Sequence, residues 1–249
     1  QPFFLYVAHG AIHAPLHAKA SDISAQKGNY SGGWDELRLR RFARQRELSI
    51  FGDDVVLAPR NTEPNNDVEP WDQLSDVQKM LYARYMEVFA AMVTNVDENT
   101  GRLLDTLDDM GELDNTIVVI MSDNGASPEG DKHGAFNSVA WYNSIPLSLD
   151  DVLPNVDLLG GPESHGHYPY GWAHAGNTPF QRWKRECHEG GVADPLIVHW
   201  PAGTNETGEV RTQYLHVIDI MPTVLDALGI EMPAVLDGVP QKPIEGKSL

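Results

Sequence analysis

The sequence predicts an α/β fold, and three observations support that prediction. Apolar residues recur at helical spacing from Val77 to Leu107, which predicts a long amphipathic helix. The β-branched run Thr116–Met121 has the length of a central strand, and Leu196–His199 has the length of another short strand. A helix followed by a tight turn and a strand is typical of α/β layers.

The segments before the long helix are of two kinds. The apolar stretch Phe3–Ala8 predicts a buried strand. Between Ala18 and Asp67 the chain is polar and broken by Gly and Pro, which indicates peripheral helices and loops. Five arginines lie between Arg38 and Arg46, and such a short basic run favours a solvated helix face over an anion site.

The long helix and the segments after it carry their own boundary signals. Ser75 and Gln78 fit a capping box, and Gly111 is the predicted stop, with a weak point expected at 99–101. Residues 150–172 are rich in Gly and Pro and are expected to form a long irregular loop. Apolar spacing from Val217 predicts a helix that ends at Gly229 and becomes regular near Pro222.

Composition excludes several classes of protein. The 249 residues carry 18 basic and 36 acidic side chains, and the net charge of −18 argues against a nucleic-acid partner. A hydrophobic content of 41% excludes global disorder, and no apolar run approaches the ~18–20 residues of a membrane-spanning helix. The single cysteine, Cys187, excludes a disulfide scaffold and a thiolate zinc cage.

Four polar residues follow or precede the predicted strands, where the chemistry of open α/β sheets is found. His13 follows the first strand, Asp123 and Asn124 follow the second, and Lys184 precedes the third. Each has an ordinary interpretation: a structural histidine, an Asp-Asn-Gly turn, a surface lysine. The carboxylate and carboxamide suit Ca²⁺ or Mg²⁺ better than zinc. A cation, an imidazole and an ammonium that converge would form a site for a tetrahedral oxyanion.

The string from Asn177 to Lys184 continues into His188-Glu189-Gly190-Gly191 and His199-Trp200-Pro201. In this order it resembles the signature of bacterial arylsulfatases, the formylglycine-dependent sulfatases of the alkaline-phosphatase superfamily. The resemblance implies an alkaline-phosphatase-like mixed, largely parallel sheet flanked by helices and present only in part. Residues 1–249 would then be the C-terminal part of a sulfatase catalytic domain, without an internal domain boundary.

The resemblance also implies an activity and a site. The parent protein would hydrolyse sulfate monoesters, with aryl sulfates as the expected substrates. Asp123 and Asn124 would be two of four Ca²⁺ ligands, with Mg²⁺ as the alternative ion. Lys184 would contact the sulfate, and His13 would lie against the ester and help the leaving oxygen depart; both would bind substrate and act in catalysis. A protein of charge −18 repels sulfate esters at long range, so the site needs local positive charge. His188 is expected to be structural.

The family's nucleophile is a formylglycine made from a Cys/Ser-x-Pro-x-Arg motif, and the sequence does not contain this motif. Cys187 lacks the proline, and Ser144 has Ser148 where the arginine is required. Because the chain starts at Gln1 without a Met, we expect it to be truncated at the N-terminus, and at the C-terminus as well. The formylglycine and two further calcium ligands would lie upstream, and the isolated segment is predicted to be inactive.

Two alternatives stay open at this point. One is a phosphonate or phosphate ester hydrolase of the same superfamily; a zinc member would need an imidazole within Ser122–Gly125, where the sequence has a carboxamide. The other is a non-catalytic remnant that acts as a binding module. The expected partner is a small sulfate ester, with no nucleic acid and no membrane span. Bacterial cytoplasm and periplasm are both compatible with the sequence, because no signal region lies in the chain.

Overall fold

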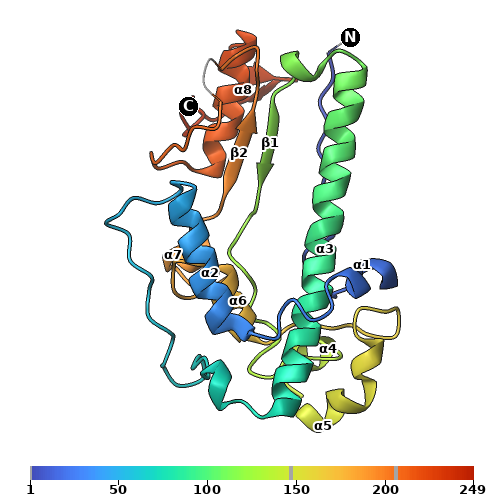
Figure 1. Ribbon diagram of the computed structural model, residues 1–249. Helices are drawn as coiled ribbons and strands as arrows, with labels where there is room; N and C mark the ends of the chain where they lie inside the picture. Colours follow the sequence, from blue (N-terminus) through green and yellow to red (C-terminus); the bar gives the residue numbers. More distant parts are fainter. Residues whose placement is uncertain (1, 146–147, 205–206) are drawn as a thin grey trace. The chain divides into compact units, whose positions relative to one another are not determined.

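The computed structural model describes residues 2–145, 148–204 and 207–249 (Figure 1). The α-helices are α1 (Ala20–Ala25), α2 (Gly33–Glu47), α3 (Asp76–Asp109), α4 (Val139–Tyr142), α5 (Leu149–Val152), α6 (Tyr170–Gly176), α7 (Glu189–Val192) and α8 (Ile220–Leu228). The 3₁₀ helices are η1 (Trp71–Gln73), η2 (Leu113–Asn115), η3 (Leu153–Leu158) and η4 (Val217–Asp219). The strands are β1 (Val118–Met121), β2 (Leu196–His199), β3 (Val235–Leu236) and β4 (Val239–Pro240). None of the described helices is long and apolar enough to cross a membrane.

The chain divides into two compact units. Unit 1 consists of Gln1–Leu113 and Val118–His199, and unit 2 consists of Asp114–Ile117 and Trp200–Leu249. All four candidate site residues lie in unit 1. The division does not test whether the chain is the C-terminal part of a catalytic domain, and that assignment stays a prediction.

The sheet differs from the prediction. Strands β1 and β2 pair antiparallel, with Val118 opposite His199 and Met121 opposite Leu196, and β3 pairs antiparallel with β4. A largely parallel sheet is therefore wrong for the described residues, in which helices predominate. The physical reason is that the chain leaves β1 and re-enters β2 at the same end of the pair, whereas a parallel pair needs a crossover to the opposite end. The alkaline-phosphatase-like architecture stays a prediction.

Helix α3 has the predicted ends. The Ser75 hydroxyl accepts from the backbone N–H of Gln78 at 3.3 Å, and the Gln78 side chain accepts from the backbone N–H of Ser75 at 2.9 Å. At the other end, Gly111 has a φ of +70° and closes the helix in the left-handed region. The helix runs without interruption through Gly101, so the expected weak point at 99–101 causes no break.

The core of unit 1 is aromatic and lies where α2 and α6 pack together beside α3 (Figure 1). The ring of Trp34 stacks on Tyr82 and meets the edge of Trp172, each at 5.6 Å between centroids. The indole N–H of Trp172 donates to the backbone carbonyl of Tyr82 at 2.7 Å. The Met and aromatic stripe of α3 therefore packs into a core, as predicted.

Of two predictions before the long helix, the strand is wrong and the solvated basic face is confirmed except at one arginine. Residues 3–8 form no strand, and Phe4 is 87% and Tyr6 81% exposed. A buried strand needs a neighbour to satisfy its backbone N–H and C=O groups, and none of the described strands pairs with this stretch. Four of the five arginines are exposed, as predicted for a solvated helix face: Arg40, Arg41, Arg44 and Arg46. Arg38 is the exception, because it is buried and its guanidinium donates to the carbonyls of His174, Ala58, Pro179 and Phe180. Four carbonyl acceptors offset the cost of burying this charge.

The remaining predicted elements are confirmed in part. Strand β2 has the predicted bounds and β1 covers most of its predicted run, although Ile120 and Met121 are about 40% exposed rather than buried on both faces. The expected irregular loop at 150–172 contains the short helices α5 and η3. In the string Ser144–Ser148, Pro146 and Leu147 lie outside the described residues.

Unit 2 is built around α8. This helix ends at Leu228, and Gly229 follows it with a left-handed φ of +63°, which confirms the predicted Gly stop. The Asp219 carboxylate accepts from the backbone N–H groups of His216 and Lys247, at 2.8 and 2.9 Å, and these bonds hold the pKa of Asp219 below its usual range. They tie the end of the chain to the start of η4 and α8.

Candidate functional site

The loop after β1 and the loop that carries Lys184 are joined by backbone hydrogen bonds. The N–H of Gly125 donates to the carbonyl of Gly191 at 3.2 Å, and the N–H of Lys184 donates to the carbonyl of Ala126 at 3.1 Å. The side chain of Asn177 adds a third link, because it accepts from Ala126 N–H at 2.9 Å. Segments more than 50 residues apart in the sequence thus form one hydrogen-bonded layer.

Glycine is required where these loops meet. A Cβ atom at Gly125 would overlap the carbonyl oxygen of Gly190, and a Cβ at Gly190 would overlap the carbonyl of Gln181. Both clashes are with backbone, which cannot swing away as the end of a side chain can. The glycines of the Asp-Asn-Gly and Gly-Gly sequences are therefore required by backbone packing, whether or not a ligand binds.

The loop that carries His13 is anchored by Leu16. The Leu16 side chain is buried, and its backbone N–H donates to the carbonyl of Gly166 at 2.9 Å. The ring of His17 adds a bond of 2.6 Å from Nε2 to the carbonyl of Ser164. These contacts hold the exposed His13 at a fixed place in unit 1.

His13 and Lys184 meet although 171 residues separate them. Lys184 Nζ lies 3.2 Å from His13 Nε2. His13 Nδ1 lies 2.8 Å from the carbonyl oxygen of Ala14, which can only accept, so Nδ1 carries a proton. Nε2 can then accept a hydrogen bond from the Lys184 ammonium. The Lys184 side chain is 22% exposed, so the charge is open to a ligand.

A buried carboxylate, Glu129, lies beside this pair. Its Oε2 is 4.0 Å from Lys184 Nζ and 3.0 Å from the hydroxyl of Ser127. Ser127 Oγ is in turn 3.1 Å from Nε2 of His167, whose Nδ1 donates to the carbonyl of Tyr168 at 3.0 Å. Burial lowers the pKa of His167 to about 4, against the opposing effect of Glu129, so the ring is neutral at pH 7.

Sequence reasoning missed Glu129, Ser127 and His167. Glu129 lies only a few residues beyond the predicted strand end, but a single acidic residue in a Gly-rich loop carries no spacing signal. His167 belongs to the segment 150–172, which looked like an irregular loop. Their association depends on contacts between residues about 40 positions apart, which periodicity does not detect.

Asp123 and Asn124 lie at the end of the layer joined through Gly125. Asp123 is exposed, and the side-chain amide of Asn124 donates to the carbonyl of Gly125 at 3.0 Å, which leaves its oxygen available. Burial and the negative charge of Asp123 raise the pKa of Asp194 to about 6. Crowded oxygen donors of this kind suit a hard cation. Among residues 2–145, 148–204 and 207–249, no group of three or more His, Cys, Asp or Glu side chains could hold a metal ion.

Two neighbours of Lys184 take no part in this arrangement. Cys187 is a free, exposed thiol. The ring of His188 is exposed and lies 4.0 Å from the carboxylate of Glu186, while its backbone carbonyl accepts from Gly191 N–H at 2.8 Å. The backbone of His188 thus supports the loop, and its side chain points to no other candidate residue.

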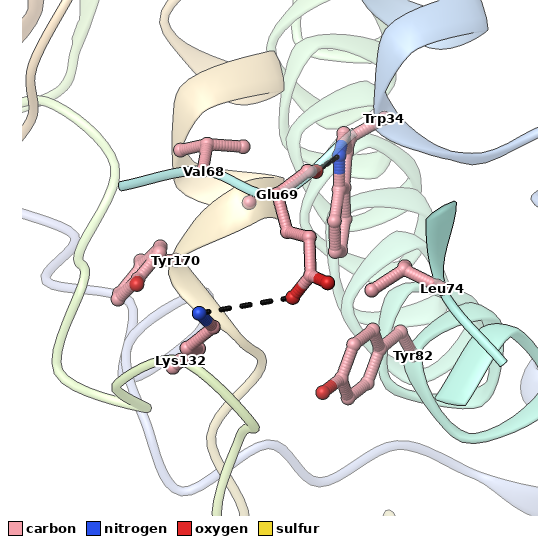
Figure 2. Close-up of a pocket in the computed structure, with 8 residues that line it drawn as sticks. Trp34, Val68, Glu69, Leu74, Tyr82, Lys132 and Tyr170 are labelled. Carbon is pink, nitrogen blue, oxygen red and sulfur yellow. Dashed lines mark hydrogen bonds and ion pairs between the residues drawn. The ribbon is translucent and has the colours of Figure 1, made fainter. Parts of the chain in front are cut away.

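A second lysine, Lys132, lines a small cavity in the core of unit 1 (Figure 2). The cavity has a volume of about 10 Å³, room for roughly one water molecule. Figure 2 shows Lys132 directed at Glu69, 3.7 Å away, between the rings of Tyr82 and Tyr170. This cavity is too small for an ester substrate, and Lys132 is already paired.

Comparison with known proteins places these residues in context. A family model described as Sulfatase matches residues 1–230. An uncharacterized sulfatase of Schizosaccharomyces pombe is 35% identical over 233 residues, which are 94% of this chain and 40% of that protein. An arylsulfatase of Klebsiella aerogenes is 31% identical over 253 residues, which are 100% of this chain and 51% of that protein. The chain thus spans about half or less of the length of these two relatives.

Proposed function

The chain belongs to the sulfatase family, and on that premise we propose that it forms part of a sulfuric ester hydrolase. The proposed reaction splits a sulfate monoester into an alcohol or phenol and inorganic sulfate. Aryl sulfates are the expected substrates, and the similarity to an arylsulfatase supports this choice. The observation that carries the proposal is the 3.2 Å hydrogen bond between Lys184 and His13.

In this proposal Lys184 binds a sulfuryl oxygen. Its ammonium offsets the negative charge of the ester and of the oxygen that develops charge as the S–O bond breaks. The loops fix its position through the backbone bond from Lys184 to Ala126, so little reorganisation is needed when the ester binds.

In the same proposal, His13 helps to protonate the leaving group. The proton between Lys184 Nζ and His13 Nε2 is within reach of an ester oxygen that binds to the same pair. Transfer of this proton to the departing oxygen would yield the neutral alcohol or phenol. Because Nδ1 is held by the carbonyl of Ala14, the ring keeps Nε2 directed at the reacting atoms.

Asp123 and Asn124 are the proposed cation ligands. Their oxygens, with Asp194 close to Asp123, fit the preference of Ca²⁺ or Mg²⁺ for hard donors. A bound cation would add positive charge beside the sulfuryl group. The formylglycine nucleophile that the family resemblance implies is not encoded within the 249 residues, so we propose that the chain by itself binds sulfate esters without turning them over.

Binding and turnover test this proposal together. Phenyl sulfate should bind to the chain in isothermal titration calorimetry with calcium present, and Lys184→Ala should weaken binding at least tenfold. The matched control is Lys27→Ala, an exposed lysine on another surface, which should leave the affinity unchanged. The same chain should release no 4-nitrophenol from 4-nitrophenyl sulfate. An unchanged affinity in Lys184→Ala would refute the anion site. Measurable turnover would refute the predicted inactivity.

A further inference from the structure

The carboxylate of Glu129 is an unexpected neighbour for an anion-binding lysine. Its side chain is only 9% exposed, and its Oε2 lies 4.0 Å from Lys184 Nζ. A negative charge at this distance reduces the attraction of Lys184 for any anion. Its presence therefore needs a reason beyond anion binding itself.

The groups around Glu129 hold its carboxyl group in place. Its Oε2 faces the ammonium of Lys184 and the hydroxyls of Ser127 and Tyr142, at 3.0 and 3.5 Å, and all three can donate. Ser127 Oγ in turn accepts from the backbone N–H of Glu129 at 3.3 Å. These contacts fix the carboxyl group of Glu129 beside Lys184.

The position of Glu129 sets how strongly it acts on a ligand. An oxygen within hydrogen-bonding distance of Lys184 Nζ lies at most about 7 Å from Glu129 Oε2, the sum of a bond of about 3 Å and the 4.0 Å ion pair. At that distance, and with the effective dielectric of a protein surface, each unit of negative charge on the ligand is disfavoured roughly 10- to 100-fold.

We propose that Glu129 makes the site selective for singly charged sulfate esters over doubly charged phosphate esters. The inference rests on the proposed function, since it assumes that Lys184 binds the ester. A sulfate monoester carries one negative charge at neutral pH, whereas a phosphate monoester carries nearly two because its second pKa is about 6. Glu129 repels the second charge in addition to the first. Lys184 supplies binding, and Glu129 supplies the discrimination between two esters of the same shape.

A pair of ligands with equal shape and different charge tests this inference. Phenyl sulfate and phenyl phosphate are titrated into the 249-residue chain at pH 8 and at one calcium concentration, and the ratio of their dissociation constants is the readout. We expect the wild-type chain to prefer phenyl sulfate. Glu129→Gln keeps the shape and removes the charge, so it should reduce this preference roughly 10- to 100-fold.

Two further variants control for charge and for folding. Glu129→Asp keeps the negative charge and should keep the preference. Glu69→Gln removes a partly exposed carboxylate that pairs with Lys132, changes the net charge equally, and should leave the ratio unchanged (Figure 2). Circular dichroism checks that each variant is folded. If Glu129→Gln does not fold, the wild-type chain at pH 5 replaces it: phenyl phosphate is then a monoanion, and its disadvantage should shrink.

The outcomes separate this inference from the proposed function. If the wild-type chain binds phenyl sulfate but Glu129→Gln has the wild-type ratio, or Glu69→Gln changes the ratio as much, Glu129 is not the source of selectivity. An unchanged ratio in the wild-type chain at pH 5 contradicts the inference in the same way. If the wild-type chain fails to bind phenyl sulfate at all, the proposed function fails first and the inference fails with it.

Discussion

In the core of unit 1, the side chains of Trp34, Tyr82 and Trp172 pack ring against ring, and α3 is capped by its own residues. In the loops around Lys184, backbone hydrogen bonds join the segments, and glycines stand where the backbones meet. The first region is stabilised mainly by buried apolar area. The second is held by backbone hydrogen bonds, which its glycines allow because they have no side chain to keep the backbones apart. Substitutions should therefore separate stability from ligand binding.

The largest expected effect is in the core. Trp172→Ala removes a fully buried ring and the hydrogen bond to the carbonyl of Tyr82, and should lower the free energy of unfolding by about 3–5 kcal/mol. Urea denaturation followed by circular dichroism measures this loss. The control Leu39→Ala changes an exposed side chain of the neighbouring α2 and should change stability by less than about 0.5 kcal/mol. Equal effects of the two substitutions would mean that the aromatic cluster does not stabilise unit 1.

Gly125→Ala should act on the loops. The added methyl group would collide with the carbonyl of Gly190, separate the two loops and cost about 1–3 kcal/mol. Because Lys184 is held by the same layer, binding of phenyl sulfate should also be lost. The control is Gly101→Ala in α3, where nothing lies within 4 Å of the new methyl and the helix should gain about 0.5–1 kcal/mol. Normal binding in Gly125→Ala would show that this contact does not position the site.

Acid should weaken the core. Burial lowers the pKa of His174 to about 3, and the positive charges of Arg38 and Arg60 add to the effect. An unfolded histidine has a pKa near 6.5, so below that pH the unfolded chain binds more protons than the folded chain. The stability present above pH 6.5 should therefore fall as the pH drops toward 4, by about 1.4 kcal/mol per pH unit for this histidine.

Urea denaturation at pH 7, 6 and 5 measures this slope, and His174→Gln provides the comparison. The variant lacks the buried titrating group, so its stability should depend less steeply on pH than that of the wild-type chain. The buried His167 should contribute a similar slope in both proteins. Identical slopes in the two proteins would contradict the assignment of acid sensitivity to His174.

The smallest expected effect concerns calcium. If Asp123 is a ligand, calcium should raise the melting temperature of the wild-type chain, and Asp123→Ala should reduce this rise; a tenfold loss of affinity corresponds to about 1.4 kcal/mol. Asp97→Ala removes an exposed carboxylate of α3 and serves as the control. A calcium-induced rise that is the same in all three proteins would exclude Asp123 as a ligand.

The comparison of the two regions also explains which features the sequence could predict. Helix α3 was predictable because its cap and its apolar stripe are local signals within one segment. The direction of β1 against β2 was not, since it depends on where a chain of more than 70 residues returns. The strand prediction for Phe3–Ala8 was wrong for a similar reason, because an apolar run does not reveal whether a partner strand is present.

For the candidate site as well, contacts between distant segments could not be predicted from the sequence. His13 and Lys184 were selected as residues near predicted strands, and they lie within hydrogen-bonding distance of each other, while their roles in binding and catalysis stay predictions. Glu129 was not predicted as a site residue because its role depends on its contacts with Lys184 and Ser127, which only the folded chain shows. The burial of Arg38 was not predicted because its four carbonyl acceptors lie 20 to 142 residues away in the sequence.

A double-mutant cycle on His13 and Lys184 tests the central claim most directly. The dissociation constant of phenyl sulfate is measured for the wild-type chain, for His13→Ala, for Lys184→Ala and for the double variant. If the two side chains form one anion site, their effects should not add, and the coupling free energy should reach about 1 kcal/mol. Additive effects would mean that imidazole and ammonium act independently, and the account of a shared sulfate ester site would be wrong.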